Sequence, residues 1–134
     1  DLVTGIADLL GMSVDLVKAV VTEGLIDAAR GLGRKVADLL DKAWAKGPNL
    51  SAEERGHLAT AIATAKVAAT RNGLELCSRL FEVTGARSTH ASLRLDRHWR
   101  NLRTQTLHDP VDYKLHELGD WALNQSLPIP TFYS

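Results

Sequence analysis

Residues 51–70 read SAEERGHLATAIATAKVAAT, a pattern typical of the start of a long helix. Ser51 and Glu54 have the spacing of a capping box, in which a hydroxyl and a carboxylate satisfy free amides at a helix start. Residues 58–70 are rich in alanine and threonine, and small side chains let helix backbones approach closely. The stretch predicts a helix over about residues 52–83 at the centre of a bundle.

Upstream, apolar residues recur at helical spacing between Leu16 and Ala43, with Ser13 as a good N-cap residue. The sequence Lys46-Gly47-Pro48 should end this helix. Three glycines interrupt the pattern, and we expect them to mark a kink or close contact with another helix: Gly24, Gly31 and Gly33.

Downstream, Gly85 should end the long helix, and residues 86–91 form a polar loop before a third helix over 92–107. Asp109 can cap a fourth helix with Pro110 at its first position, where the missing N–H costs nothing. The fourth helix should end at residues 124–126.

The predicted fold is therefore all-α, an up-and-down four-helix bundle in a single domain over residues 1–134. Residues 1–13 form an atypical N-terminal segment, with a short helix over 1–10. Residues 127–134 contain two prolines and should form an extended tail that could dock on a partner. Aromatic residues are only 5% of the chain, which favours helix packing over a β-sandwich.

Composition excludes several classes of protein. The formal net charge is zero, which argues against a general nucleic-acid or membrane-surface binder. Cys77 is the only cysteine, which fits a reducing, cytoplasmic compartment, and no apolar run is long enough for a transmembrane helix. There is no signal-peptide pattern. The chain begins at Asp1 rather than Met, so we expect a processed or truncated product.

Basic and imidazole side chains gather between residues 85 and 110. The loop GARST (85–89) could cradle a phosphate with the side chains of Arg87, Ser88 and Thr89, although its spacing alone favours an ordinary turn followed by an N-cap. Arginines then recur at positions 94, 97, 100 and 103, as an anion-binding stripe or as a solvated face paired with Asp96. The pattern predicts an anion site close to a proton-transfer site.

His108 is the candidate proton-transfer residue, because imidazole titrates near neutral pH. The alternative is that its ring only caps the preceding helix. The spacing of the histidines is too wide for a helical metal pair, and there is no CxxC, so no metal is predicted: His90, His98, His108 and His116. The tryptophans should anchor packing: Trp44, Trp99 and Trp121.

Several motifs occur together in one order: WAKGPNLSAEERG (44–56), LFEVTGAR (80–87), DRHWRN (96–101), RTQTLHDPVDYK (103–114) and a Pro-x-Pro tail. In order and spacing they resemble the C-terminal end of flavin-dependent monooxygenases with the acyl-CoA dehydrogenase fold, closest to the dibenzothiophene monooxygenase group. The resemblance implies homotetramers that use O₂ and reduced FMN from a separate flavin reductase. It also implies a helical N-terminal domain and a β-barrel domain that precede this chain.

The resemblance also implies roles for single residues. Arg87 would reach the FMN of a neighbouring subunit, with Gly85 and Ser88 beside it. His108 would be the active-site histidine that assists oxygen transfer to an organosulfur or aromatic heterocyclic substrate. The tail would pack against an adjacent subunit.

Two departures qualify these roles. Gln105 stands where the family often has histidine, and glutamine cannot shuttle a proton. Asp109-Pro110-Val111 stands where acyl-CoA dehydrogenases often have Glu-Gly-Thr, which favours oxygenation over dehydrogenation. Two alternatives stay open: a non-catalytic helical assembly module, and a fragment of an acyl-CoA dehydrogenase.

Overall fold

The computed structural model describes Ser13, Asp15 and residues 24–129, and this part of the chain contains helices and no strand. The elements in chain order are α3 (Leu25–Lys46), η1 (Gly47–Asn49), α4 (Ala52–Thr84), η2 (Ala86–Thr89), η3 (Ala91–Leu93), α5 (Asp96–His108) and α6 (Val111–Asn124). The prediction of an all-α fold with four main helices is confirmed.

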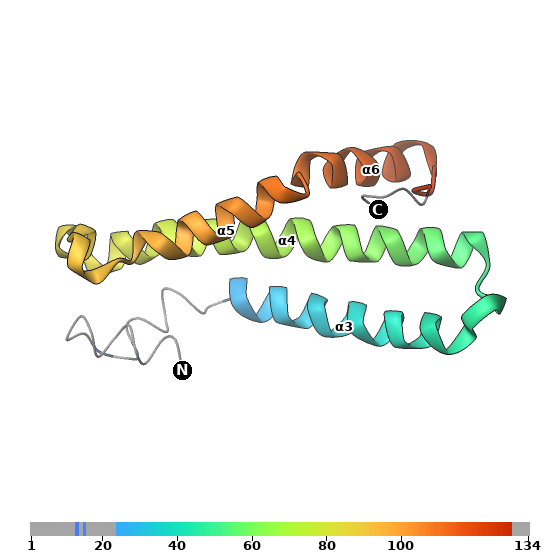
Figure 1. Cartoon of the computed structure of the whole chain (residues 1–134), viewed down its shortest axis with the longest axis horizontal. Helices are drawn as coiled ribbons and strands as arrows, with labels where there is room; N and C mark the ends of the chain where they lie inside the picture. The colour runs from blue at the N-terminus through green and yellow to red at the C-terminus, as the bar shows by residue number, and fades with distance from the viewer. Residues whose placement is uncertain (1–12, 14, 16–23, 130–134) are drawn as a thin grey trace.

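The long helix α4 forms the centre of the molecule. Figure 1 shows α3 running along one side of α4 and α6 along the opposite side, with α5 drawn over the C-terminal part of α4 and leading into α6. The close packing between main helices all involves α4. The predicted central position of this helix is therefore confirmed.

The predicted capping box starts α4. The Ser51 hydroxyl accepts from the Glu54 amide at 3.1 Å, and the Glu54 carboxylate accepts from the Ser51 amide at 3.0 Å. The same carboxylate pairs with Lys46 at the end of α3, so the box also joins two helices. The hydrogen bond from Lys46 and then that from the Ser51 backbone lower the pKa of Glu54 from 4.5 to about 2.

Small side chains form the buried stripe of α4, which consists of Gly56, Thr60, Ala63, Val67, Thr70 and Leu80. The threonine hydroxyls donate to carbonyls within the helix, such as Thr60 Oγ1 to Gly56 O at 3.0 Å. These groups therefore need no partner from another helix, and neighbours can pack closely against the stripe. A Cβ placed on Gly73 would lie 2.6 Å from Cδ2 of Leu102 on α5.

Helix α3 differs from the prediction in two ways. It begins at Leu25, directly after Gly24, which has φ +91. Gly31 and Gly33 lie inside an unbroken helix, and a Cβ on either would meet nothing within 4 Å among the described residues. The expectation of a kink or close contact is therefore wrong at both positions. The predicted helical residues 1–10 and 16–23 lie outside the described residues.

The apolar side of α3 is poorly covered, and none of its residues is buried. Trp44 is 84% exposed, so its predicted role as a packing anchor is wrong within the described part of the chain. Trp99 is 44% exposed, and Trp121 is half-buried.

Helix α5 begins at Asp96 instead of residue 92. Arg94 has left-handed backbone angles, φ 50 and ψ 31, and it separates the short helix η3 from α5. An isolated left-handed residue ends the first helical turn because it cannot continue a right-handed helix. Arg94 is therefore outside the arginine stripe of α5.

The predicted N-cap role of Asp109 is also wrong. Pro110 is the N-cap of α6, and no side chain caps that helix start. The Asp109 carboxylate instead pairs with Lys66 of α4, since a charged partner in reach gives a stronger interaction than a neutral amide.

Residues 125–129 follow α6 without helical structure, as predicted for the described part of the tail. Leu127 packs on α4 of its own chain, where a Cβ on Gly56 would lie 2.8 Å from the Leu127 Cβ. The tail thus begins as part of this domain. Phe132 and Tyr133, which could dock on a partner, lie outside the described residues.

Candidate functional site

The turn after α4 carries the three predicted cofactor-binding residues. Gly85 has φ +70, and its amide donates to Phe81 O at 2.9 Å, which closes the end of α4. A positive φ suits glycine, because it has no Cβ to clash. The chain then turns sharply into η2, and Arg87 is carried on this turn.

Ser88 stabilises the turn from within. Its side chain is 1% exposed, and its hydroxyl donates to Gly85 O at 2.6 Å. Thr89 makes an equivalent bond to Ala86 O at 2.7 Å. Both hydroxyl protons are therefore used inside the loop, and because Ser88 is buried, only the exposed Thr89 oxygen is left to accept from a ligand.

Arg87 is the outward-facing group of this loop. It is exposed and makes no ion pair with another described residue. It lines an open hollow of about 400 Å³ with Ala86, Thr89, His90, Ser92 and Leu93. The His90 Nδ1 lies 2.8 Å from the Ser92 hydroxyl, so this ring is held close to the hollow.

The donor chemistry of this loop fits a flavin nucleotide. A free guanidinium offers a rigid fork of N–H donors to a phosphate or to the polar edge of a flavin ring. The hollow is open, however, and a buried ring would need walls from elsewhere. The loop fits one side of an FMN site.

The arginines of α5 divide between pairing and exposure. Arg100 Nη2 lies 3.1 Å from Asp96 Oδ2, with both side chains more than half exposed. The prediction that Arg100 lies on a solvent-exposed helix face and pairs with Asp96 is therefore confirmed. Arg97 and Arg103 are exposed on the same helix.

His108 is the last residue of α5, and its side chain is exposed. No described residue makes a hydrogen bond or ion pair with its ring. The imidazole is therefore free to meet a group from outside this chain. Gln105, one turn earlier, is exposed as well.

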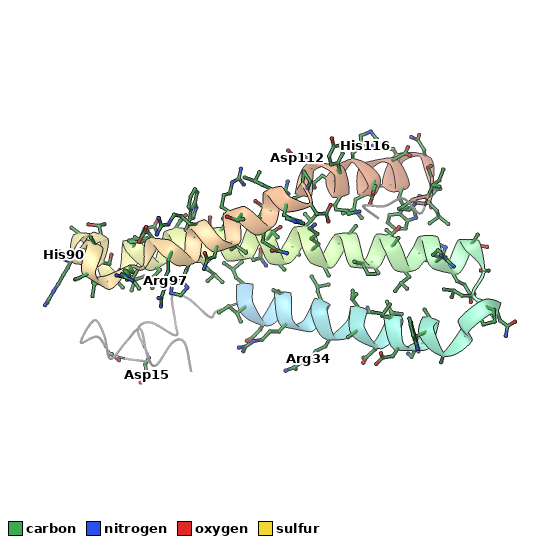
Figure 2. All side chains as sticks on the ribbon, viewed as in Figure 1. Asp15, Arg34, His90, Arg97, Asp112 and His116 are labelled. Carbon is green, nitrogen blue, oxygen red and sulfur yellow. The ribbon has the colours of Figure 1, made fainter. Side chains whose placement is uncertain are left out.

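The structure separates the two parts of the predicted site. Arg87 lies before the start of α5, and His108 is the last of the 13 residues of this helix, so the length of the helix separates them. At 1.5 Å per residue this is about 20 Å. In Figure 2, His90 and Asp112 mark the two ends of this path. Within one chain, the predicted phosphate loop at Arg87 is therefore separate from His108, whereas Arg103 lies on the same helix as His108 and five residues before it.

Lys66, which contacts the junction between α5 and α6, could not be recognised from the sequence. Lys66 donates to the Asp109 main-chain oxygen at 2.8 Å and pairs with its carboxylate. The two residues are 43 positions apart, and a lysine in an alanine-rich helix is normally read as solvent-facing. The pair forms because α4 packs beside the α5–α6 junction, which brings Lys66 and Asp109 together.

No metal site or membrane span emerges from the described residues. In this part of the chain, no three histidine, cysteine or carboxylate side chains are grouped closely enough to hold a metal ion. Among the same residues, no helix combines the length and apolar character that crossing a membrane requires.

Partial burial raises the pKa of the Cys77 thiol.

Comparison with known proteins gives a consistent result. The family described as acyl-CoA dehydrogenase, C-terminal domain, matches residues 18–113. A probable FMNH2-dependent monooxygenase, SfnC of Pseudomonas putida, is 68% identical over 109 residues, which are 81% of this chain and 28% of that protein. Dibenzothiophene monooxygenase of Mycolicibacterium goodii is 50% identical over the same length, 26% of its own.

Solved structures agree with the sequence relatives. Methanesulfinate monooxygenase MsuC from Pseudomonas fluorescens is 84% identical with a TM-score of 0.78, over 82% of this chain and 28% of that one. FMN-bound TdsC from Paenibacillus sp. A11-2 is 38% identical with a TM-score of 0.76, over 98% of this chain and 30% of that one. This chain thus spans less than a third of the relatives that it matches.

Proposed function

Because this chain belongs to the family of acyl-CoA dehydrogenase C-terminal domains, we propose that it is the C-terminal domain of an FMN-dependent two-component monooxygenase. The observation that carries the proposal is its sequence similarity, along 109 residues, to an FMNH2-dependent monooxygenase and to dibenzothiophene monooxygenases. The proposal covers the longer protein, because the relatives extend well beyond the matched region.

The proposed reaction uses reduced FMN from a separate flavin reductase together with O₂. When bound, reduced FMN supplies the two electrons that activate O₂. One oxygen atom goes to an organosulfur or aromatic heterocyclic substrate and the other leaves as water. The compounds in the names of two relatives, methanesulfinate and dibenzothiophene, both contain sulfur, which favours an organosulfur substrate.

Two residues of this chain would act in that reaction. Arg87 would hold FMN through its guanidinium, on a turn that Gly85 permits and Ser88 braces. His108 would give or accept a proton beside the reacting atoms, since its ring is exposed and an imidazole can both donate and accept a proton.

The distance between these residues supports an oligomeric site. A separation of about 20 Å along α5 lets Arg87 and His108 serve two different flavins in a homotetramer. The N-terminal and β-barrel domains of the longer protein would supply the remaining walls of the flavin site.

We also propose that this protein acts in the cytoplasm and has no nucleic-acid partner.

A helical assembly module is the second candidate function. Large apolar side chains on the outer surface favour it, among them Trp44, Leu123 and Ile129, each at least 80% exposed. Such side chains need a covering surface. The proposal of an acyl-CoA dehydrogenase is less well supported, because Lys66 engages the Asp109 carboxylate that would have to act as a base.

The deciding experiment uses the full-length protein with chemically reduced FMN and ¹⁸O₂. Methanesulfinate and dibenzothiophene are supplied as substrates, and products are analysed by mass spectrometry. We expect one ¹⁸O atom in the product. Reduction of a dye with an acyl-CoA, without oxygen incorporation, would identify a dehydrogenase instead. No turnover in either assay would favour the assembly module.

A further inference from the structure

Lys66 reaches from the middle of α4 to the two-residue link between α5 and α6. Its ammonium donates to the main-chain oxygen of Asp109 at 2.8 Å and also pairs with the Asp109 carboxylate. One cation therefore holds both the backbone and the side chain of the same residue. Such a contact fixes the direction of the chain as well as the position of a carboxylate.

The link itself has few other restraints. Asp109 ends α5 with φ −127 and ψ 95, and Pro110 precedes α6 with φ −58 and ψ 125. No side chain caps the start of α6. Among the described residues, the side chain that connects this link to α4 is that of Lys66.

The pair is partly shielded from water. The side chains of Lys66 and Asp109 are 21% and 32% exposed, and Asp109 Oδ1 is buried without a hydrogen-bond partner among the described residues. A cavity of about 350 Å³ lies beside the pair, with Lys114 and Glu117 also in its lining. A partly shielded carboxylate depends on its cation more than an exposed one does, because fewer water molecules can replace the lost partner.

His108 is the residue directly before Asp109 and the last of α5. Its ring has no partner among the described residues, so the backbone sets where its Cα lies and which space the ring can reach. We propose that Lys66 is a positioning residue for His108, because it clamps Asp109 to α4 and so fixes where the end of α5 presents the imidazole. This inference rests on the proposed function, since it assigns Lys66 to the same oxygenation site.

The test compares variants of the full-length protein. Lys66→Met removes the clamp, Lys66→Arg keeps a cation that can reach both acceptors, and Lys66→Gln keeps one neutral donor on a shorter side chain in case the methionine variant does not fold. Lys46→Met is the matched control, because it removes another lysine–carboxylate pair, with Glu54, at the start of α4.

The first readout is hydrogen–deuterium exchange in the flavin-free protein. We expect exchange over residues 105–113 to rise about tenfold in Lys66→Met, as local opening becomes easier, and to stay near wild type in Lys66→Arg and Lys46→Met. Unchanged exchange in Lys66→Met would overturn the clamp.

The second readout is product formed per FMNH2 oxidised. We expect a loss of about tenfold or more in Lys66→Met with rescue in Lys66→Arg, since small displacements of a reacting group are costly. Faster exchange with wild-type coupling would show that Lys66 only supports the fold, which overturns the positioning role. If the wild type itself forms no product, the proposed function fails and the positioning role fails with it, whereas the exchange data still report on the clamp.

Discussion

Leu127 lies against Gly56, so close that a Cβ on the glycine would come within 2.8 Å of the leucine Cβ. This contact joins the first residues of the tail to the second turn of α4. The absence of a side chain at position 56 is therefore a packing requirement. The start of the tail follows a fixed path along its own domain.

Gly56→Ala should destabilise the chain. Insertion of a methyl group into a packed contact costs about 1–3 kcal/mol, whereas alanine in place of glycine in a helix gains about 1 kcal/mol. The contact at Gly56 involves the Leu127 Cβ, which cannot move without the backbone, so we expect a net loss of about 1 kcal/mol. Urea denaturation of the purified chain measures this change.

Two matched variants test the reasoning. At Gly73 the nearest atom is the tip of Leu102, which can rotate away, so Gly73→Ala should lose less stability than Gly56→Ala. At Gly31 no atom of the described residues lies within 4 Å of an added Cβ, so Gly31→Ala should gain about 0.5–1 kcal/mol. Equal effects at all three positions would show that helix propensity, and not packing, decides the outcome.

The Lys46–Glu54 pair should make stability depend on pH in the acid range. The folded pKa of Glu54 is lowered to about 2 from 4.5, so its contribution is full above about 4.5 and is lost as the pH falls towards 2. Glu54→Gln keeps a capping-box acceptor but removes the charge. We expect the stability difference between wild type and this variant to shrink between pH 5 and pH 2.

The same difference should shrink when salt is added at pH 7, because both side chains are largely exposed and salt screens such pairs. Urea denaturation at each pH and salt concentration measures both effects. A difference that is constant from pH 5 to pH 2 would contradict a charge-dependent contact.

Arg87→Ala should weaken FMN binding by the full-length protein. Loss of one hydrogen-bonding charge costs about 1.5–3 kcal/mol, which corresponds to roughly 10- to 100-fold in Kd. Flavin fluorescence titration measures the change. Arg100→Ala is the control, because Arg100 already pairs with Asp96 and should not touch the flavin. An unchanged Kd in Arg87→Ala would remove this residue from the site.

His108→Ala should uncouple flavin oxidation from product formation. General acid or base groups contribute about 100-fold or more, so product per FMNH2 should fall sharply while FMNH2 is still consumed. Hydrogen peroxide released alongside the remaining product is the measurement. His57→Ala serves as the control, because His57 is exposed at the start of α4 and, among the described residues, forms an ion pair with Glu53 alone, at 3.9 Å. Wild-type coupling in His108→Ala would exclude a chemical role.

Local signals determined most of the helices. The capping box at Ser51, the Lys46-Gly47-Pro48 breaker and Gly85 after α4 all act within a few residues, and the structure places helix ends at each of them. The start of α5 could not be read in the same way. Arg94 adopts left-handed angles, and arginine has no local preference for them that a sequence pattern would reveal.

Sequence alone also determined the chemical character of the candidate site. The turn at Gly85 and the exposure of Arg87 follow from local composition, because polar and glycine-rich loops lie on protein surfaces. The roles of Arg87 in flavin binding and of His108 in proton transfer stay predictions.

Only the tertiary structure decided which distant residues meet. The contacts of Lys66 with Asp109 and of Gly56 with Leu127 join positions 43 and 71 residues apart, which no local pattern encodes. It also showed that α5 holds Arg87 and His108 apart, because a rigid helix converts 13 residues into a fixed length. Local propensity fixes the helices, whereas the packing of small residues along α4 fixes how they meet.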